Sequence, residues 1–165
     1  MVDAIVLWLQ GISPEAIVVI VAAIPVAELR GAIPVALAYG MSLQKAYVLS
    51  VIGNALPVIP ILFLFQPVSA RLRTFRPFER FFNWLSARTM RRSETIQKYE
   101  MLGLILFVAI PLPMTGAYTG AIAATLLKMK FRYGFIGTML GILIAGLVVS
   151  ALCAIGMIGW QTVTQ

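Results

Sequence analysis

Long apolar runs dominate this chain of 165 residues and restrict its fold more than any other feature. Runs of roughly 20 apolar residues recur, and a helix of that length crosses the hydrocarbon core of a bilayer. The composition agrees, since 61% of the residues are hydrophobic, 12% are charged and the mean hydropathy is +0.95. A soluble domain of this kind would have too little polar surface to face water. We therefore expect an all-α polytopic membrane protein.

Two hydrophobic blocks, about 15–65 and 101–160, flank a basic segment and begin in a similar way. The first contains AIPVAELRGAIPVAL from Ala23, and the second contains AIPLPMTGAYTGAIA from Ala109, so Ala-Ile-Pro recurs at a spacing of 86. The shared order of elements in the two blocks predicts an internal repeat. The same spacing pairs Tyr47 with Tyr133.

Each block contains two short apolar arms, a Pro/Gly-rich break between them, and then a long apolar helix. A helix of about 11 residues is about 16 Å long, roughly half of the hydrocarbon core. Two such arms can enter the membrane, turn near its midplane and return as a re-entrant hairpin. The alternative is that each pair of arms makes one full crossing or two thin ones. The predicted arms are 15–26, 32–41, 101–111 and 116–127, and the predicted long helices are 43–65 and 131–159.

Re-entrant hairpins would leave one crossing in each block, so the two blocks would insert in opposite orientations as an inverted repeat. Segment 66–100 holds eight of the 13 Lys and Arg and should lie in the cytoplasm of a prokaryotic cell, below its plasma (inner) membrane. In this topology Lys128, Lys130 and Arg132 fall on the same side. The predicted parts are an interfacial N-terminal segment, 1–14, a first repeat, 15–65, a basic amphipathic linker, 66–100, and a second repeat, 101–165.

The first break, AIPVAELRGAIP, places two charges within an apolar block. A charge at the bilayer centre costs about 2.5–3.5 kcal/mol on insertion scales, so such residues face protein or a water-filled cavity. Pro25 weakens the first arm, Gly31 lets the chain turn, and Pro34 lies in the first turn of the second arm. Glu28 and Arg30 are then expected at an unwound tip, where they bind substrate. The alternative is that they only lock the two hairpins together.

The second break, PLPMTGAYTG, carries no charge but is rich in residues that end helices or supply hydroxyl groups. Thr115 is expected to cap the outgoing arm. Both outgoing arms would begin at the midplane with free N–H groups, which favours an anion site. Packing between hairpins is the alternative explanation. The residues predicted to bind substrate here are Pro111, Pro113, Thr115, Gly116, Tyr118 and Thr119, in addition to Glu28, Arg30, Gly31 and Pro34 of the first break.

The chain has no histidine and a single cysteine, Cys153. A catalytic triad or a transition-metal site has nothing to be built from, so we expect no enzyme activity, no metal and no cofactor. Segment 66–100 alternates bulky apolar residues with arginines, which favours contact with anionic membrane lipids over nucleic acid. Asn54 would either line a site or satisfy backbone groups that are freed at a kink beside PVIP.

The segments AELRGAIPVALAYG, GNALPVIP and PLPMTGAYTGA closely resemble the small multidrug export protein family over about 15–160. The layout is also distantly similar to the DedA (VTT-domain) membrane proteins. Those have paired re-entrant hairpins with an intramembrane acidic residue and arginine, and are linked to polyprenyl-phosphate recycling and lipid scrambling. This similarity implies that Glu28 and Arg30 match the acidic and basic tip residues. The second break departs from it, because it has neither an acid nor an arginine.

We expect a secondary transporter that works as a homodimer and moves an anionic or amphiphilic small molecule or lipid, such as a lipid-linked phosphate, between the two tips. Arg30 and the arm N-termini would hold the anionic group. Glu28 would carry protons, since burial favours the neutral form of a carboxyl group. Two alternatives stay open: export of cationic drugs bound by Glu28, and a non-transporting membrane scaffold or assembly factor that acts through 66–100.

Overall fold

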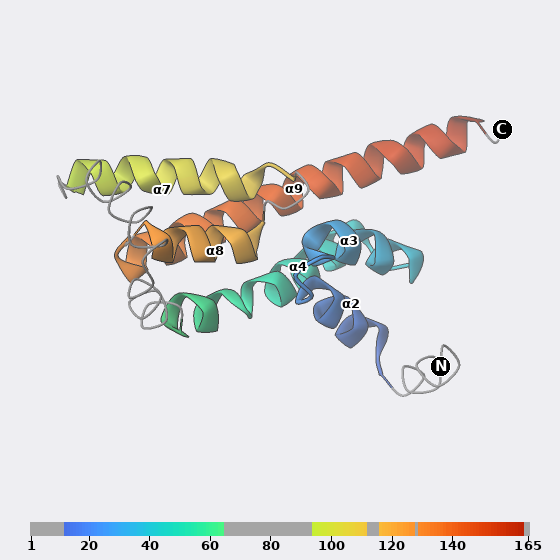
Figure 1. Cartoon of the computed structure of the whole chain (residues 1–165). Coiled ribbons are helices and arrows are strands. Elements are labelled where there is room, and N and C mark those ends of the chain that lie inside the picture. Colours follow the sequence, from blue (N-terminus) through green and yellow to red (C-terminus); the bar gives the residue numbers. More distant parts are fainter. Residues whose placement is uncertain (1–11, 65–93, 112–115, 128, 164–165) are drawn as a thin grey trace. The chain divides into compact units, whose positions relative to one another are not determined.

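The computed structural model describes residues 12–64, 94–111, 116–127 and 129–163 (Figure 1). All regular secondary structure within these ranges is helical, which confirms the all-α class. Two helices among them, Leu43–Leu64 and Phe131–Met157, are long and apolar enough to cross a membrane. The predicted interfacial helix, which falls mainly on 1–11, and the linker up to residue 93 lie outside the described residues.

The chain forms two compact units, and both long helices contribute to each of them. The first unit, Met1–Leu56 with Leu143–Gln165, contains α2 (Pro14–Ala22), α3 (Glu28–Ala38), α4 (Leu43–Ala55) and the end of α9 (Phe131–Val163). The second unit, Pro57–Ile142, contains helical residues 58–64, α7 (Glu94–Ala109), α8 (Ala117–Leu126) and the start of α9. Each unit therefore combines one pair of short helices with parts of both long helices. The predicted division at the linker stays a prediction.

Capping residues fix the helix ends of the first unit. Ser13 and Ser42 precede α2 and α4, and each hydroxyl accepts a hydrogen bond from the backbone N–H three residues later, at 3.3 and 3.4 Å. The end of α3 is closed by Gly40, whose φ of 75° is open to glycine without steric cost. The Met41 N–H then donates to the Ala36 carbonyl at 3.1 Å, which is the bond of a Schellman motif.

The second arm of the first pair begins earlier than the sequence predicted. The turn occupies residues 23–27, where Pro25 cannot donate a helical hydrogen bond, and α3 begins at Glu28 instead of residue 32. The prediction that Pro34 lies in the first turn of this arm was therefore wrong, because Pro34 is inside α3. The interior proline removes the N–H that the Arg30 carbonyl would otherwise receive.

The other helix boundaries follow the sequence more closely. The first long helix is interrupted where a kink was predicted beside Asn54: α4 ends at Ala55, and the helix resumes at residue 58 after Pro57. α7 ends at Ala109, before Pro111, as predicted. Its start at Glu94 lies within the segment assigned to the linker, so the predicted arm beginning at 101 was too short.

The packing of one helix against a glycine recurs in the two units. In the first unit, a Cβ added to Gly53 would overlap the Val19 carbonyl oxygen and lie 2.7 Å from the Cβ of Ala22. In the second unit, a Cβ added to Gly141 would lie 2.5 Å from the Cβ of Val108, and 3.2 Å from the carbonyl oxygen of Ile105. In both units a glycine of a long helix lets the first short helix approach closely.

Buried positions recur with the same relation. Val19 and Ala22 correspond to Ile105 and Val108, which lie 86 residues later in the chain. The two glycines that these residues contact, Gly53 and Gly141, are 88 residues apart. From the outgoing arm through the long helix, equivalent positions of the two units are 88 residues apart. The stretch between the two short helices is therefore two residues longer in the second unit. Tyr47 and Tyr133 are 86 residues apart, so the predicted match between them does not follow the spacing of these contacts. The pairs buried on both sides at 88 are Glu28/Gly116, Leu29/Ala117, Ala32/Gly120, Ile33/Ala121, Ala36/Ala124, Ala46/Gly134, Ser50/Thr138, Gly53/Gly141, Asn54/Ile142, Val58/Gly146 and Leu62/Ser150.

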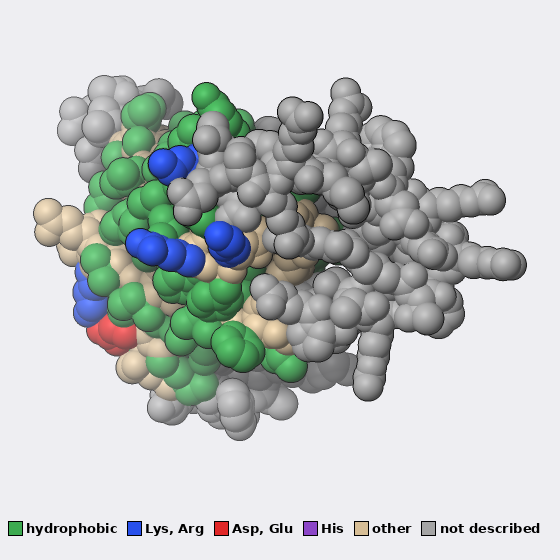
Figure 2. Space-filling model, turned by 90° about the vertical axis from the view of Figure 1, so that its left-hand side faces the viewer, with side chains coloured by type: hydrophobic (Ala, Val, Ile, Leu, Met, Phe, Trp, Pro, Cys, Tyr) green, Lys and Arg blue, Asp and Glu red, His purple; other side chains and the backbone are tan. Residues whose placement is uncertain are grey.

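The two candidate spans expose much of their apolar surface. Only 28% of the residues in the best window of Leu43–Leu64 are buried, and 33% in that of Phe131–Met157. Large side chains such as Leu147 and Ile155 face outward, at 59% and 66% exposure. Figure 2 shows hydrophobic side chains over one face of the described part, with a few cationic groups among them. Helices of this kind suit lipid surroundings, where an apolar exterior is stable.

Candidate functional site

The turn between α2 and α3 forms the first tip. Three backbone hydrogen bonds close it: the Ile24 N–H donates to the Val21 carbonyl at 3.1 Å, and the N–H groups of Ala27 and Glu28 both donate to the Ile24 carbonyl, at 3.2 and 3.0 Å. Val26 is 95% exposed at the end of this turn. The turn thus leads directly into the first residue of α3, which is Glu28.

Glu28 combines a strained backbone with a buried side chain. Its φ is 46°, and it is the one non-glycine residue with positive φ among the described residues. The left-handed region costs a residue with a Cβ about 1–2 kcal/mol. The residue is only 7% exposed, although it carries a carboxyl group. Strain of this kind is concentrated at functional sites, where the surrounding fold holds it in place.

Arg30 lies within ion-pair distance of Glu28. Its Nη2 is 3.9 Å from the Glu28 Oε2, which is a charge contact and too long for a direct hydrogen bond. The Arg30 side chain is 32% exposed, whereas that of Glu28 is 9% exposed. Residues two apart normally point to different sides of a helix, and the positive φ of Glu28 redirects the chain at that point. The guanidinium therefore offsets the charge of the carboxylate and keeps contact with the surroundings.

Gly31 lies beside this pair, but it does not form the turn. It is part of α3, and a Cβ there would lie 3.0 Å from the Cβ of Ala27 and 3.7 Å from a methyl carbon of Val21. The prediction that Gly31 lets the chain turn was wrong, because residues 23–27 already make the turn. Its missing side chain instead allows the start of α3 to lie close to the tip and to α2.

The second tip is described in part. Pro113 and Thr115 lie outside the described residues, and Pro111 lies two residues after the end of α7. Thr115 was predicted to cap α8, but the N-cap residue is Gly116, which makes no side-chain hydrogen bond to the helix. The backbone of Gly116 is extended, with φ of 161°.

The remaining residues of the second tip lie at the start of α8. The Thr119 hydroxyl donates to the Gly116 carbonyl at 3.2 Å. Tyr118, the residue before it, is half-buried. Gly116 is buried, whereas Thr119 is exposed. Neither α3 nor α8 has a side-chain N-cap, and the Glu28 N–H at the start of α3 donates to the Ile24 carbonyl instead. Glu28, Arg30, Gly31 and Pro34 belong to the first unit, and the described residues of the second tip belong to the second unit.

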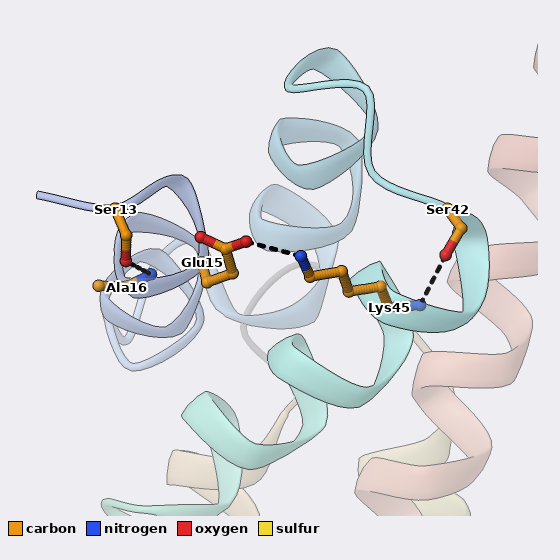
Figure 3. Close-up of polar contacts among 5 residues, drawn as sticks. All are labelled: Ser13, Glu15, Ala16, Ser42 and Lys45. Carbon is orange, nitrogen blue, oxygen red and sulfur yellow. Dashed lines mark hydrogen bonds and ion pairs between the residues drawn. The ribbon is translucent and has the colours of Figure 1, made fainter.

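An ion pair at the start of the first unit was not predicted. The Lys45 Nζ donates to the Glu15 Oε1 at 2.6 Å and so joins the first turn of α2 to the first turn of α4 (Figure 3). This hydrogen bond, the contact of Glu15 with its own backbone and the charge of Lys45 hold the pKa of the Glu15 carboxyl below its ordinary value of 4.5. The separation of 30 residues hid this contact, because no local pattern links the two side chains.

Three buried polar side chains were also missed, or only half recognised. Within the part of the chain that the structure describes, no hydrogen-bond partner is found for the oxygen atoms Ser50 Oγ, Asn54 Oδ1 and Ser150 Oγ. Asn54 was expected to line a site or to satisfy freed backbone groups, and this choice stays open, because only its accepting oxygen is unpaired and a freed carbonyl would need the Nδ2 donor. Among the described residues, no group of three His, Cys, Asp or Glu side chains is placed to hold a metal ion.

Comparison with known proteins gives one match. A family model described as "Putative small multi-drug export protein" matches residues 28–148, which is more than half of the chain and begins at Glu28. No curated protein and no solved structure matches the chain. The similarity to DedA proteins stays a prediction.

Proposed function

The chain belongs to this small multi-drug export family, and from that premise we propose that it is a secondary transporter built from an inverted repeat. Membrane location follows from the family and from the two apolar helices, Leu43–Leu64 and Phe131–Met157. Substrate, coupling ion, orientation and oligomeric state belong to the proposal. The single observation that carries it is Glu28, a buried and backbone-strained carboxyl residue beside Arg30 at the tip of a broken apolar segment.

Recurrence of contacts supports the repeat. Gly53 and Gly141 receive the first short helix of their own unit in the same way, and eleven pairs of positions are buried at a common spacing of 88. Such recurrence is expected when two halves descend from one hairpin-plus-helix unit. Hairpins that return to their own side would give each half a single crossing, and so opposite orientations in the membrane. The short lengths of α3 and α8, 11 and 10 residues, favour this over full crossings.

The chemistry of the first tip supports an anionic or amphiphilic substrate. Arg30 is partly exposed, so a phosphate or carboxylate can reach its guanidinium. Glu28 would release or accept the proton that drives transport, because its carboxyl is buried and in ion-pair contact with that same guanidinium. Substrate that takes Arg30 would leave Glu28 without its counter-charge and favour its protonation.

The family description favours a second candidate, export of cationic compounds. In that case the Glu28 carboxylate binds the cationic compound, and the Arg30 guanidinium pairs with this carboxylate when no compound is bound. Both candidates use the same pair in opposite roles. The sign of the charge on the transported molecule therefore distinguishes them.

The test is flux in proteoliposomes that hold purified full-length protein under an imposed pH gradient. Short- and long-chain polyprenyl phosphates and cationic dyes are supplied separately, to wild type and to the Glu28→Gln and Arg30→Gln variants. Phosphate-dependent proton flux that both variants lose would support the anionic substrate. Dye movement that Glu28→Gln alone loses would favour drug export. Folded protein that moves neither class would contradict transport and favour a scaffold acting through 66–100.

A homodimer, contact with anionic lipids through 66–100, and the absence of enzyme activity are further parts of the proposal. A chain of 165 residues is small for a complete transport pathway, which favours two copies. Crosslinking in native membranes tests the dimer. Binding of vesicles with and without anionic lipid to a peptide of 66–100 tests the lipid contact.

A further inference from the structure

Two buried polar side chains of α4 lack hydrogen-bond partners. Ser50 and Asn54 are 0% and 1% exposed, and within the described residues no partner is found for the Ser50 Oγ or the Asn54 Oδ1. They lie four residues apart, so both side chains belong to one face of the helix. A buried oxygen without a hydrogen bond is unfavourable, and inside a bilayer no lipid tail can supply the missing partner. The two side chains therefore point to a partner that enters the unit from outside it.

The second unit provides an internal control for packing. At the spacing of 88, Ser50 corresponds to Thr138 and Asn54 corresponds to Ile142. Thr138 is equally buried, but its hydroxyl donates to the Gly134 carbonyl at 2.8 Å and so is satisfied within its own helix. Ile142 is buried and apolar. Helices of this kind therefore pack at these positions without an unpaired oxygen, and packing does not explain the polarity of α4.

A proline break adds a backbone oxygen beside the two side chains. The first long helix is interrupted after Ala55, and because Pro57 has no N–H, the Gly53 carbonyl lacks the donor that a regular helix would supply. The residue matched to Pro57 at the spacing of 88 is Ala145, and α9 runs through it without a break. In membrane helices, a carbonyl that is freed in this way is satisfied by side chains or ordered water. The break thus adds a second reason for water at this place, again in the first unit alone.

The two polar residues lie on α4 between its contacts with α2 and with α9. Gly53 packs against α2, as described above. α4 contacts α9 through Tyr47 and Val51, since a Cβ added to Gly146 would lie 2.7 Å from a ring carbon of Tyr47 and 3.4 Å from a methyl carbon of Val51. With about 3.6 residues per turn, the two polar residues fall in the sector between these contacts. They therefore face the interior of the first unit and not the lipid.

This interior sector lies at the end of the unit that holds the first tip. A Cβ added to Gly53 would lie 2.7 Å from the Cβ of Ala22, which is the last residue of α2. The turn of residues 23–27 then leads directly to Glu28, whose N–H donates to the Ile24 carbonyl at 3.0 Å. The strained carboxyl residue and the polar face of α4 thus occupy the same end of the first unit.

We propose that Ser50 and Asn54 line an aqueous path into the first unit, along which water and the polar part of a substrate approach the first tip. Both residues are buried in the present conformation, so the path opens only when the helices of the unit separate there. Water both donates and accepts hydrogen bonds, so it satisfies a hydroxyl, an amide oxygen and a freed carbonyl without adding a charge. The second unit, with Thr138 and Ile142 at the matched positions, stays closed to water. Access of substrate rests on the proposed transport function, whereas entry of water does not.

Cysteine labelling tests this path. Cys153 is the one cysteine of the chain, so Cys153→Ala gives a background without thiols. Ser50→Cys and Asn54→Cys place a thiol on the proposed path, and Thr138→Cys and Ile142→Cys place one at the matched buried positions of the second unit. Full-length variants in proteoliposomes are treated with a small charged methanethiosulfonate, which reacts with the ionised thiol and therefore needs water beside it. Intact mass measures the rate of modification.

Both variants of the first unit should be modified at least tenfold faster than the two variants of the second unit. The Tm of each variant shows whether it is folded. Equal rates in the two units, or no modification of either first-unit variant in folded protein, would overturn the proposal.

Replacement of the amide provides a second readout that needs no thiol. Asn54→Leu exchanges the amide for an apolar side chain of similar size, as the second unit has at Ile142. Its Tm should be unchanged or higher than that of wild type, and its substrate-dependent flux should fall at least tenfold. A lowered Tm with unchanged flux would show that the amide serves stability alone and would contradict the proposal. Labelling as predicted, without flux of any substrate in wild type, would reject the transporter and leave the aqueous path standing.

Discussion

Gly53 provides the most quantitative test of the packing in the first unit. Replacement by alanine adds one methyl group, and that carbon would overlap the Val19 carbonyl oxygen and lie 3.0 Å from the Val19 Cα. These are backbone atoms, so no side-chain rotation relieves the overlap, and α2 must move away from α4. Overpacking of this kind costs about 1–3 kcal/mol. At about 2–4 °C per kcal/mol for a protein of this size, the Tm of Gly53→Ala should fall by about 2–12 °C.

Gly156→Ala is the matched control for this substitution. Gly156 is also in the part of α9 that belongs to the first unit, and a Cβ there would meet nothing within 4 Å. Both variants gain the preference of alanine over glycine in a helix, about 0.5–1 kcal/mol, so the difference between them isolates the steric cost. Unfolding of both proteins is followed by circular dichroism in the same detergent. Equal Tm values for the two variants would refute the close approach of α2 to α4.

Three further predictions concern single side chains of the first unit. Glu28→Gly should be about 1–2 kcal/mol more stable than Glu28→Ala, because glycine adopts a φ of 46° without strain; equal unfolding free energies would contradict the strained backbone. The pair of Glu15 and Lys45 should stabilise the fold above pH 4.5 and lose this effect as the pH falls through the lowered pKa of Glu15. The Tm of Glu15→Gln should therefore change less than that of wild type between pH 5 and pH 3 at low salt, and identical Tm profiles would count against the pair. Tyr47→Phe should cost about 0.5–1.5 kcal/mol in chemical unfolding, since the Leu143 carbonyl loses a donor at 3.2 Å, and an unchanged midpoint would show that this bond adds nothing.

The features of the fold that the sequence predicted are those set by local chemistry. The long apolar stretches predicted the two candidate spans. α7 ends just before Pro111, as expected, and the first long helix is interrupted at Pro57, where a kink was expected. These outcomes follow from hydropathy and from the missing N–H of proline, which act within a few residues.

The features that the sequence missed depend on contacts between distant segments. Gly31 was read as a turn residue, because glycine often is one, but its role is close packing with Ala27 inside α3. The spacing of 86 described only the incoming arm, since an insertion of two residues in the second turn is invisible until Gly53 and Gly141 are seen in the same contact.

For the candidate site, the sequence singled out the right kind of residue but not its conformation. Glu28 and Arg30 stood out because charges are rare in apolar blocks, and they do lie within 3.9 Å of each other. The positive φ of Glu28 could not be read from its residue type, because glutamate has no preference for that region. Whether these residues bind substrate stays a prediction.

The central claim is that Glu28 couples a proton to transport, and one paired measurement tests it most directly. Substrate-dependent proton flux is compared in proteoliposomes for wild type, Glu28→Gln and Glu15→Gln, each shown to be folded by its unfolding transition. The two variants remove one carboxylate each from the same unit, but Glu28 is buried at the tip, whereas Glu15 is a surface partner of Lys45. The account predicts that Glu28→Gln abolishes pH-driven flux and that Glu15→Gln retains it. Normal flux in Glu28→Gln, or equal loss in both variants, would contradict the account.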